Sequence, residues 1–283
     1  MNGNTKNLAA LMRLLRKAAV FGASSAAILM FATAAHADNL VLNGSFELNG
    51  GPGQIGNDTT LADWSVPAPS GSYVFLFNPG SADTTGVNGE YGNLQLWGPN
   101  NGSPNSLPAT SPDGGYYAAL DGDFQVSALQ QTITGLTAGD TYAVSFYWAA
   151  AQQAGFTGPT VQAMNVCLGT SAESYVDAGT QPLSGGANNP ANLSCSGSGA
   201  STATFNLPSE GFSGWQFQTF DLTANSSTDV LSFLAYGNIQ VPPFALLDGV
   251  SLTPTPEPGT LPLLFTGLMG GLGVLRSRKW LKR

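Results

Sequence analysis

TYAVSFYWA, residues 141–149, decides the fold class of this chain. Large apolar side chains recur at every second position, which is the period of a β-strand with one buried face. Similar short runs recur through residues 38–252, which we expect to form one domain, and turn-forming stretches such as TAGD and ANSSTD separate them. The pattern predicts an all-β antiparallel sandwich, with strands at 39–47, 73–77, 93–97, 115–120, 127–134, 141–149, 161–168, 202–207, 214–222, 230–236 and 244–252.

The N-terminal segment, residues 1–37, has the pattern of a secretory signal peptide. Its basic residues end at Lys17, and a run rich in Ala and Ser follows over residues 18–35. Ala35 and Ala37 fit the small-x-small pattern of a signal cleavage site. We expect a signal helix that directs export through the Sec pathway and is then removed. A permanently anchored helix is the alternative, because the basic region is long.

The C-terminal segment has three parts in a fixed order. A Pro-rich linker spans residues 253–259, an apolar run spans 260–275, and a basic tail spans 276–283. The apolar run is close to the shortest helix that crosses a bilayer, and the positive-inside rule places the basic tail in the cytoplasm. The alternative is that the apolar run is a helix buried in the core, but this would explain neither the Pro-rich linker before it nor the basic tail after it. The residues that define the flanks are Pro256, Glu257, Pro258, Arg276, Arg278 and Lys279.

This three-part end resembles the PEP-CTERM protein-sorting signal of exopolysaccharide-producing Gram-negative bacteria. The resemblance implies an inner-membrane anchor, recognition by an exosortase-type processing enzyme, and cleavage near Pro-Glu-Pro. It further implies delivery to the cell surface or the extracellular matrix.

The charge of the body excludes several classes of function. All 17 acidic residues lie between Asp38 and Glu257, and no Lys or Arg lies between Lys17 and Arg276. Such a body repels nucleic acid, which is bound through Lys and Arg. The chain's single His, His36, lies in the signal segment. Ser-His-Asp sites, Lys Schiff bases, P-loops and His-ligated metal sites are therefore excluded from the body.

Carboxylates are the catalytic groups that remain. A glycoside hydrolase needs only two of them, and Asp121 and Asp123 in LDGDF are the candidates for that pair. One alternative is that both residues form a turn at the end of a strand. Paired carboxylates on a loop would also suit Ca²⁺, which takes six to eight oxygen ligands.

Cys167 and Cys195 are the only cysteines of the chain. An even pair in an exported protein predicts one disulfide. Two free thiols are the alternative.

Three stretches together resemble the galactose-binding-like jelly roll of many carbohydrate-binding modules. They are LVLNGSFE followed by ADWSV, then LQQTITGLTAGDTYAVSFYWA, and finally ALLDGVSL. The resemblance implies a structural Ca²⁺ ion between the first and last strands, with Glu47 and Asp248 at the matching positions. Each of these carboxylates could instead cap a turn or accept a hydrogen bond from the backbone.

Carbohydrate recognition would use aromatic rings beside polar side chains. Trp97, followed by a Pro/Asn/Gly-rich stretch, and nearby Tyr91 are the ligand-binding candidates, although burial in the core is the alternative. The sequence therefore favours an exported, non-enzymatic surface protein that contacts polysaccharide. A secreted carboxylate-dependent glycoside hydrolase is the second hypothesis.

Overall fold

The computed structural model describes residues 38–67, 72–78, 86–175, 193–238 and 241–255. The regular elements in these ranges are all β-strands, as predicted. Their bounds are β1 (Gly53–Gln54), β2 (Val74–Phe77), β3 (Tyr117–Asp121), β4 (Leu129–Thr134), β5 (Thr141–Gln152), β6 (Thr160–Gly169), β7 (Ser174–Tyr175), β8 (Leu193–Ser194), β9 (Gly197–Ser201), β10 (Phe205–Leu207), β11 (Gln216–Thr223), β12 (Thr228–Asn238) and β13 (Pro243–Pro254).

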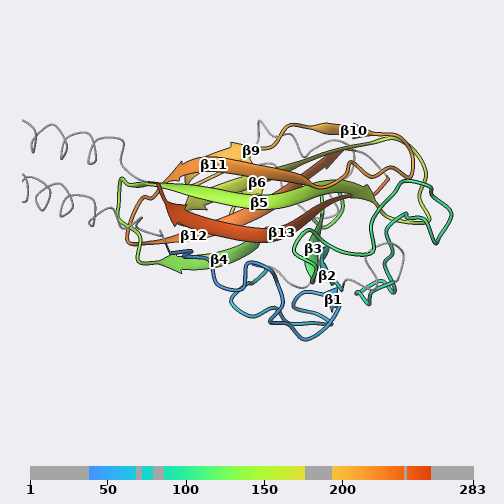
Figure 1. Ribbon diagram of the computed structural model, residues 1–283, viewed down its shortest axis with the longest axis horizontal. Coiled ribbons are helices and arrows are strands. Elements are labelled where there is room, and N and C mark those ends of the chain that lie inside the picture. The colour runs from blue at the N-terminus through green and yellow to red at the C-terminus, as the bar shows by residue number, and fades with distance from the viewer. Residues whose placement is uncertain (1–37, 68–71, 79–85, 176–192, 239–240, 256–283) are drawn as a thin grey trace, which may run out of the picture. The chain divides into compact units, whose positions relative to one another are not determined.

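Two antiparallel sheets form the two layers of a sandwich (Figure 1). The first has the strand order β1-β2-β3-β13-β5-β11, and the second has the order β10-β6-β12-β4, with β9 also paired to β6. From β3 to β6 and from β11 to β13, successive strands alternate between the two sheets. This order of crossing is that of a jelly roll, which confirms the predicted fold class.

The stretch at residues 141–149 forms the first part of β5, at the centre of the first sheet. Its buried face consists of Tyr142, Val144, Phe146 and Trp148, as the alternation predicts. β5 pairs with β11 on one side and with β13 on the other. This face packs against residues of β6 and β12, such as Val166 and Phe233, and forms the core between the sheets.

A second core covers part of the other face of the first sheet. Phe75, Tyr117 and Leu246 point to this side and pack against Leu94 and Leu96 from the long connection between β2 and β3. Residues 93–97 were predicted as a strand, and this prediction is wrong. Leu94 and Leu96 make only isolated bridges, to Val87 and Gln153, because they cover a sheet face instead of joining a sheet.

The predicted first strand, residues 39–47, is also wrong. Asn43 and Phe46 have positive φ angles of 48° and 61°, so the chain turns repeatedly in this region. It is held by side chains, since the Asn39 Oδ1 atom accepts hydrogen bonds from the N–H groups of Val41 and Leu252. The last strand continues to Pro254, two residues beyond the predicted end of the domain at 252.

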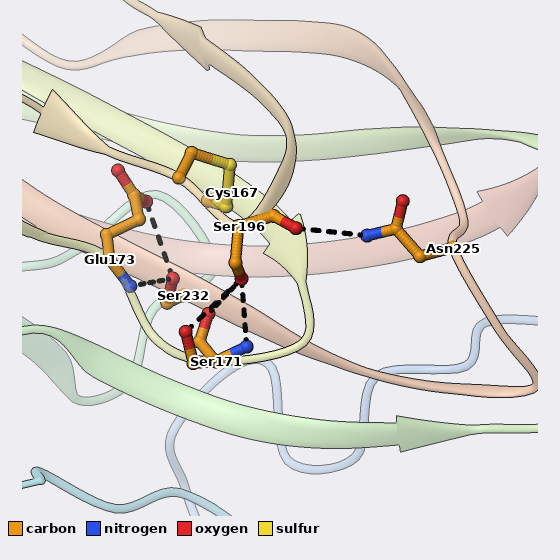
Figure 2. Close-up of a disulfide and its surroundings, with 7 residues drawn as sticks. Cys167, Ser171, Glu173, Ser196, Asn225 and Ser232 are labelled. Carbon is orange, nitrogen blue, oxygen red and sulfur yellow. Dashed lines mark hydrogen bonds between the residues drawn. A yellow bond between two sulfur atoms is a disulfide. The ribbon is translucent and has the colours of Figure 1, made fainter.

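Cys167 and Cys195 form the predicted disulfide, with Cα atoms 5.8 Å apart. It joins β6 to the residues that lead into β9 (Figure 2). On the same side of the sheet, Glu173 is buried and its N–H group donates to the Ser232 Oγ atom of β12. The disulfide and this contact fix both described ends of the connection between β6 and β9.

The predicted signal segment, 1–37, lies outside the described residues, as do the Pro-Glu-Pro motif, the apolar run and the basic tail. Within the described ranges, no helix is long and apolar enough to span a bilayer.

Candidate functional site

The first sheet leaves part of its outer face uncovered, on β11, β5 and the end of β13. Phe217 of β11 is paired with Tyr147 of β5, which is paired in turn with Asp248 of β13. The ring centroids of Phe217 and Tyr147 are 5.0 Å apart. Phe217 is 57% exposed, which is unusual for a phenylalanine on a rigid strand. We call these two rings the aromatic pair.

A bulge in β13 shapes the other side of the aromatic pair. The register of β13 against β5 shifts between Asp248 and Ser251, and Gly249 in this bulge has a φ of 59°. A Cβ atom on Gly249 would lie 3.1 Å from the Tyr147 ring. The glycine therefore lets the Tyr147 ring lie close to the backbone of β13.

Small polar residues continue the same face beyond the aromatic pair. In the first row, Ser145 of β5 pairs with Thr219 of β11 on one side and with Ser251 of β13 on the other. In the next row, Ala143 of β5 pairs with Asp221 and Thr253 of the same two strands. Thr219 and Asp221 are exposed. A surface with hydroxyl groups beside two aromatic rings has the two kinds of group that bind a sugar: rings for its C–H faces and polar atoms for its hydroxyls.

Tyr91 and Trp97, the two predicted ligand-binding residues, lie in different surroundings. Tyr91 is 64% exposed, and its hydroxyl accepts a hydrogen bond from Gln125. Trp97 is only half-buried, and its ring N–H donates to the carbonyl of Phe156 at 2.7 Å. Among the contacts that the structure describes, none joins Tyr91 to Trp97, and their role in ligand binding stays a prediction.

The two carboxylates predicted to hold Ca²⁺ approach the same segment, residues 111–116. Glu47 is exposed, and its Oε1 atom accepts a hydrogen bond from the N–H group of Tyr116. Asp248 is fully buried beside Asp113 and Ser111. Its Oδ1 atom accepts the Gly249 N–H group at 2.7 Å, whereas its Oδ2 atom has no hydrogen-bond partner.

The surroundings of Asp248 suit a hard cation. Burial, followed by the closeness of the Asp113 carboxyl, raises the pKa of Asp248 to about 8. Oxygen ligands from carboxylates, hydroxyls and carbonyls are those that Ca²⁺ takes. Within the described residues, however, no three His, Cys, Asp or Glu side chains group closely enough to hold a metal ion. The Ca²⁺ prediction therefore stays a prediction, and Asp113 is the neighbour that the sequence did not indicate.

Asp121 and Asp123, the candidates for a hydrolytic pair, form the turn that was their alternative. The Asp121 Oδ1 atom accepts hydrogen bonds from the N–H groups of Asp123 and Phe124, at 2.8 and 3.1 Å. Asp121 is fully buried and Asp123 is 6% exposed. A glycosidic bond cannot reach the Asp121 carboxylate in this arrangement, so the geometry does not favour the hydrolase hypothesis.

Comparisons with known proteins add only distant likenesses. No protein-family profile matches the sequence, and no curated protein matches it significantly. Among solved structures, TmCBM61 in complex with β-1,4-galactotriose is 14% identical, with a TM-score of 0.34 over 77% of this chain and 99% of that one. The K1 adhesin domain of Lys-gingipain from Porphyromonas gingivalis W83 is 13% identical, with a TM-score of 0.38 over 75% of this chain and 96% of that one. Likenesses at this level support no inference about function.

Sequence reasoning missed the aromatic pair, although a signal for it was present. In GWQFQTFDL, residues 214–222, Phe220 and Leu222 share one face, and Phe217 falls on the opposite face with Thr219 and Asp221. An aromatic residue on the polar face of a strand is a candidate for a binding surface when a second ring lies beside it. Tyr147 was assigned to the outer face of its strand, but its partner across the sheet could not be known without the register.

Proposed function

We propose that this chain is an exported, non-enzymatic surface protein that binds neutral polysaccharide through the aromatic pair, Phe217 and Tyr147. The observation that carries the proposal is the exposed Phe217 ring, 5.0 Å from Tyr147, on a rigid and otherwise polar sheet face. Aromatic rings stack on the apolar faces of sugar rings, and the neighbouring hydroxyl groups can exchange hydrogen bonds with sugar hydroxyls. An exposed sheet face suits an extended polymer better than a small ligand, which is bound in an enclosed pocket.

The charge of the body selects a neutral polymer. Residues 38–255 contain no Lys, Arg or His, and Asp221 lies on the binding face itself. A polymer of uronic acids or sulfated sugars would meet only negative charge there, with no cationic side chain to pair with it. Neutral glucans, galactans and mannans are therefore the class that we expect to bind.

We further propose that Asp248 and Asp113 hold a structural Ca²⁺ ion. The support is the buried Asp248 Oδ2 atom, which has no hydrogen-bond partner, beside a second carboxyl group. The ion would bridge the two carboxylates and tie β13 to residues 111–116. Asp248 is next to Tyr147 in the sheet, so the ion would also stiffen the edge of the glycan surface.

The localisation of the protein is also part of the proposal. The signal-like segment and the PEP-CTERM-like tail support export, anchoring in the inner membrane, and processing by an exosortase-type enzyme. A polysaccharide-binding body would then retain the released protein at the cell surface or in the matrix.

Affinity electrophoresis tests the glycan proposal directly. The full chain, purified in mild detergent, is run through gels that contain a neutral polysaccharide or a polyuronate, at matched ionic strength. We expect retardation in at least one neutral polymer and none in the polyuronate. Retardation by the polyuronate alone, or by no polymer across a broad neutral panel, would refute the proposal.

A further inference from the structure

The turn from Asp121 to Gln125 carries buried oxygen atoms that the fold itself does not use. Asp121 is the last residue of β3 and is fully buried. Its Oδ1 atom accepts hydrogen bonds from two backbone N–H groups of the turn. Its other carboxylate oxygen, Oδ2, has no hydrogen-bond partner. Two residues later, Asp123 places a second carboxylate in the same turn, 6% exposed. Burying a carboxylate oxygen without a hydrogen-bond donor costs folding free energy, so a ligand from outside the chain is the expected partner.

Gln125 supplies an independent observation. Its side chain is 7% exposed; its Nε2 atom donates to the hydroxyl of the solvent-exposed Tyr91, at 3.0 Å. The amide oxygen, Oε1, is therefore directed away from the Tyr91 hydroxyl, and it is buried without a hydrogen-bond partner. Side-chain oxygens at residues 121, 123 and 125 thus occupy alternate positions of one turn, which is how calcium-binding loops commonly present their first ligands.

The backbone holds this turn in a fixed position. Tyr73, just before β2, accepts a hydrogen bond from the Asp121 N–H group at 2.9 Å and donates its own N–H to the Gln125 carbonyl at 2.8 Å. Gly122 lies so close to the end of β12 that a Cβ atom there would be 2.6 Å from the Gly237 nitrogen. Both ends of the turn are anchored, so its oxygens are arranged before any ligand binds.

No described side chain can neutralise this turn. Residues 38–255 contain no Lys, Arg or His. The carboxylates of Asp121 and Asp123 therefore have no cationic side chain to pair with among the described residues.

We propose that the turn Asp121–Gln125 binds a Ca²⁺ ion through the carboxylates of Asp121 and Asp123 and the side-chain oxygen of Gln125. The donors are oxygen atoms only, which excludes the soft transition metals that prefer nitrogen or sulfur. Ca²⁺ tolerates an irregular set of ligands completed by backbone carbonyls and water, whereas Mg²⁺ demands a near-ideal octahedron. This site is separate from the one proposed at Asp248, and it does not rest on glycan binding.

Thermal unfolding of the full chain in mild detergent, after removal of metal with EDTA, tests the proposal. The Asp248→Asn variant is the starting point, because it removes the other proposed ion. Excess CaCl₂ should raise its melting temperature by about 5–10 °C, which corresponds to a Ca²⁺ concentration about a hundredfold above Kd. Excess MgCl₂ should give a clearly smaller rise.

Adding Asp121→Asn or Asp123→Asn to this variant should abolish most of the calcium-dependent rise. Asp140→Asn, in the exposed turn between β4 and β5, is the matched control and should leave the rise unchanged. In EDTA, the Asp121→Asn chain should melt no lower than its parent, because the amide oxygen of Asn can still accept the two backbone N–H groups of the turn. The proposal is overturned if the Asp248→Asn chain shows no calcium-dependent rise, if Asp121→Asn leaves that rise intact, or if Asp121→Asn unfolds the metal-free chain.

Discussion

Phe217 and Tyr147 face each other across the β5–β11 ladder, on the side of the first sheet that points away from the core. Neither ring is needed to fill the space between the two sheets, which Phe146 and Phe233 occupy. Truncation of either ring therefore leaves the core between the two sheets intact, and this separates tests of binding from tests of folding.

Truncation of the aromatic pair should weaken polysaccharide binding. We expect Phe217→Ala to lower affinity for a neutral polymer by about 3- to 10-fold, since a stacked ring contributes about 0.5–1.5 kcal/mol beyond area burial. Tyr147→Ala should have a similar effect, and the melting temperatures should stay close to that of the wild-type chain. Phe156→Ala is the control, because Phe156 is 42% exposed but lies outside the open face. Equal losses in Phe156→Ala and Phe217→Ala would argue against this site.

Loss of the disulfide should destabilise the body without preventing binding. The bond joins residues separated by 28 positions, and the chain-entropy model gives about 3 kcal/mol for a loop of this size. We expect the Cys167→Ala/Cys195→Ala double variant to lose about this much in free energy of unfolding, measured with urea. The wild-type chain unfolded under reducing conditions should match the variant. Unchanged stability in both would contradict the prediction.

Glu173 should make the stability of the metal-free chain depend on pH. Burial raises the pKa of Glu173 well above its usual range, although a hydrogen bond with Ser232 opposes the shift. The folded chain then holds the proton more tightly than the unfolded chain, so this contribution to stability is complete below the unfolded pKa of about 4.3. This contribution of Glu173 to stability is lost as the pH rises from the unfolded pKa through the folded pKa.

Glu173→Gln removes this proton without removing the contact with Ser232 (Figure 2). We expect the variant to gain stability relative to wild type as pH rises from 4 to 8, measured by urea unfolding in EDTA. A wild-type-minus-variant difference that stays constant over this range would show that Glu173 keeps its ordinary pKa.

Processing at the two ends should be visible in the mass of the cell-surface form. We expect this form to begin at Asp38 and to lack residues 259–283, because both flanking segments are proposed as removable signals. A Glu257→Ala substitution should keep the tail and leave the chain in the membrane fraction. A wild-type surface protein that retains the apolar run would mean that the tail is a permanent anchor.

The elements that follow a local rule could be predicted from the sequence. β5 shows strict alternation because one face lies in the core and the other does not, and the Cys pair left only one disulfide to form. Leu94 and Leu96 also alternate, but they cover a sheet instead of extending it. Periodicity reports which side chains are buried, and it does not report what buries them.

The candidate sites depend on contacts between distant parts of the chain, and this is why sequence reasoning found them only in part. Asp248 was named through the resemblance to a jelly roll, but its neighbour Asp113 comes from the segment of residues 111–116, far from it in the sequence. Tyr91 was expected beside Trp97, six positions on, yet its polar neighbour is Gln125 from another turn. No local pattern specifies such a pairing.

The absence of Lys and Arg from the body has a practical consequence. Trypsin, which cuts after these residues, has no site between Lys17 and Arg276. The whole sandwich therefore emerges from a digest as one fragment too large for routine peptide sequencing. Amine-reactive dyes and crosslinkers find no lysine there either, so a processed form would present only its new terminal amine. Surveys of surface proteins that rely on these reagents would overlook this one, and proteases that cut at acidic or aromatic residues are the suitable tools.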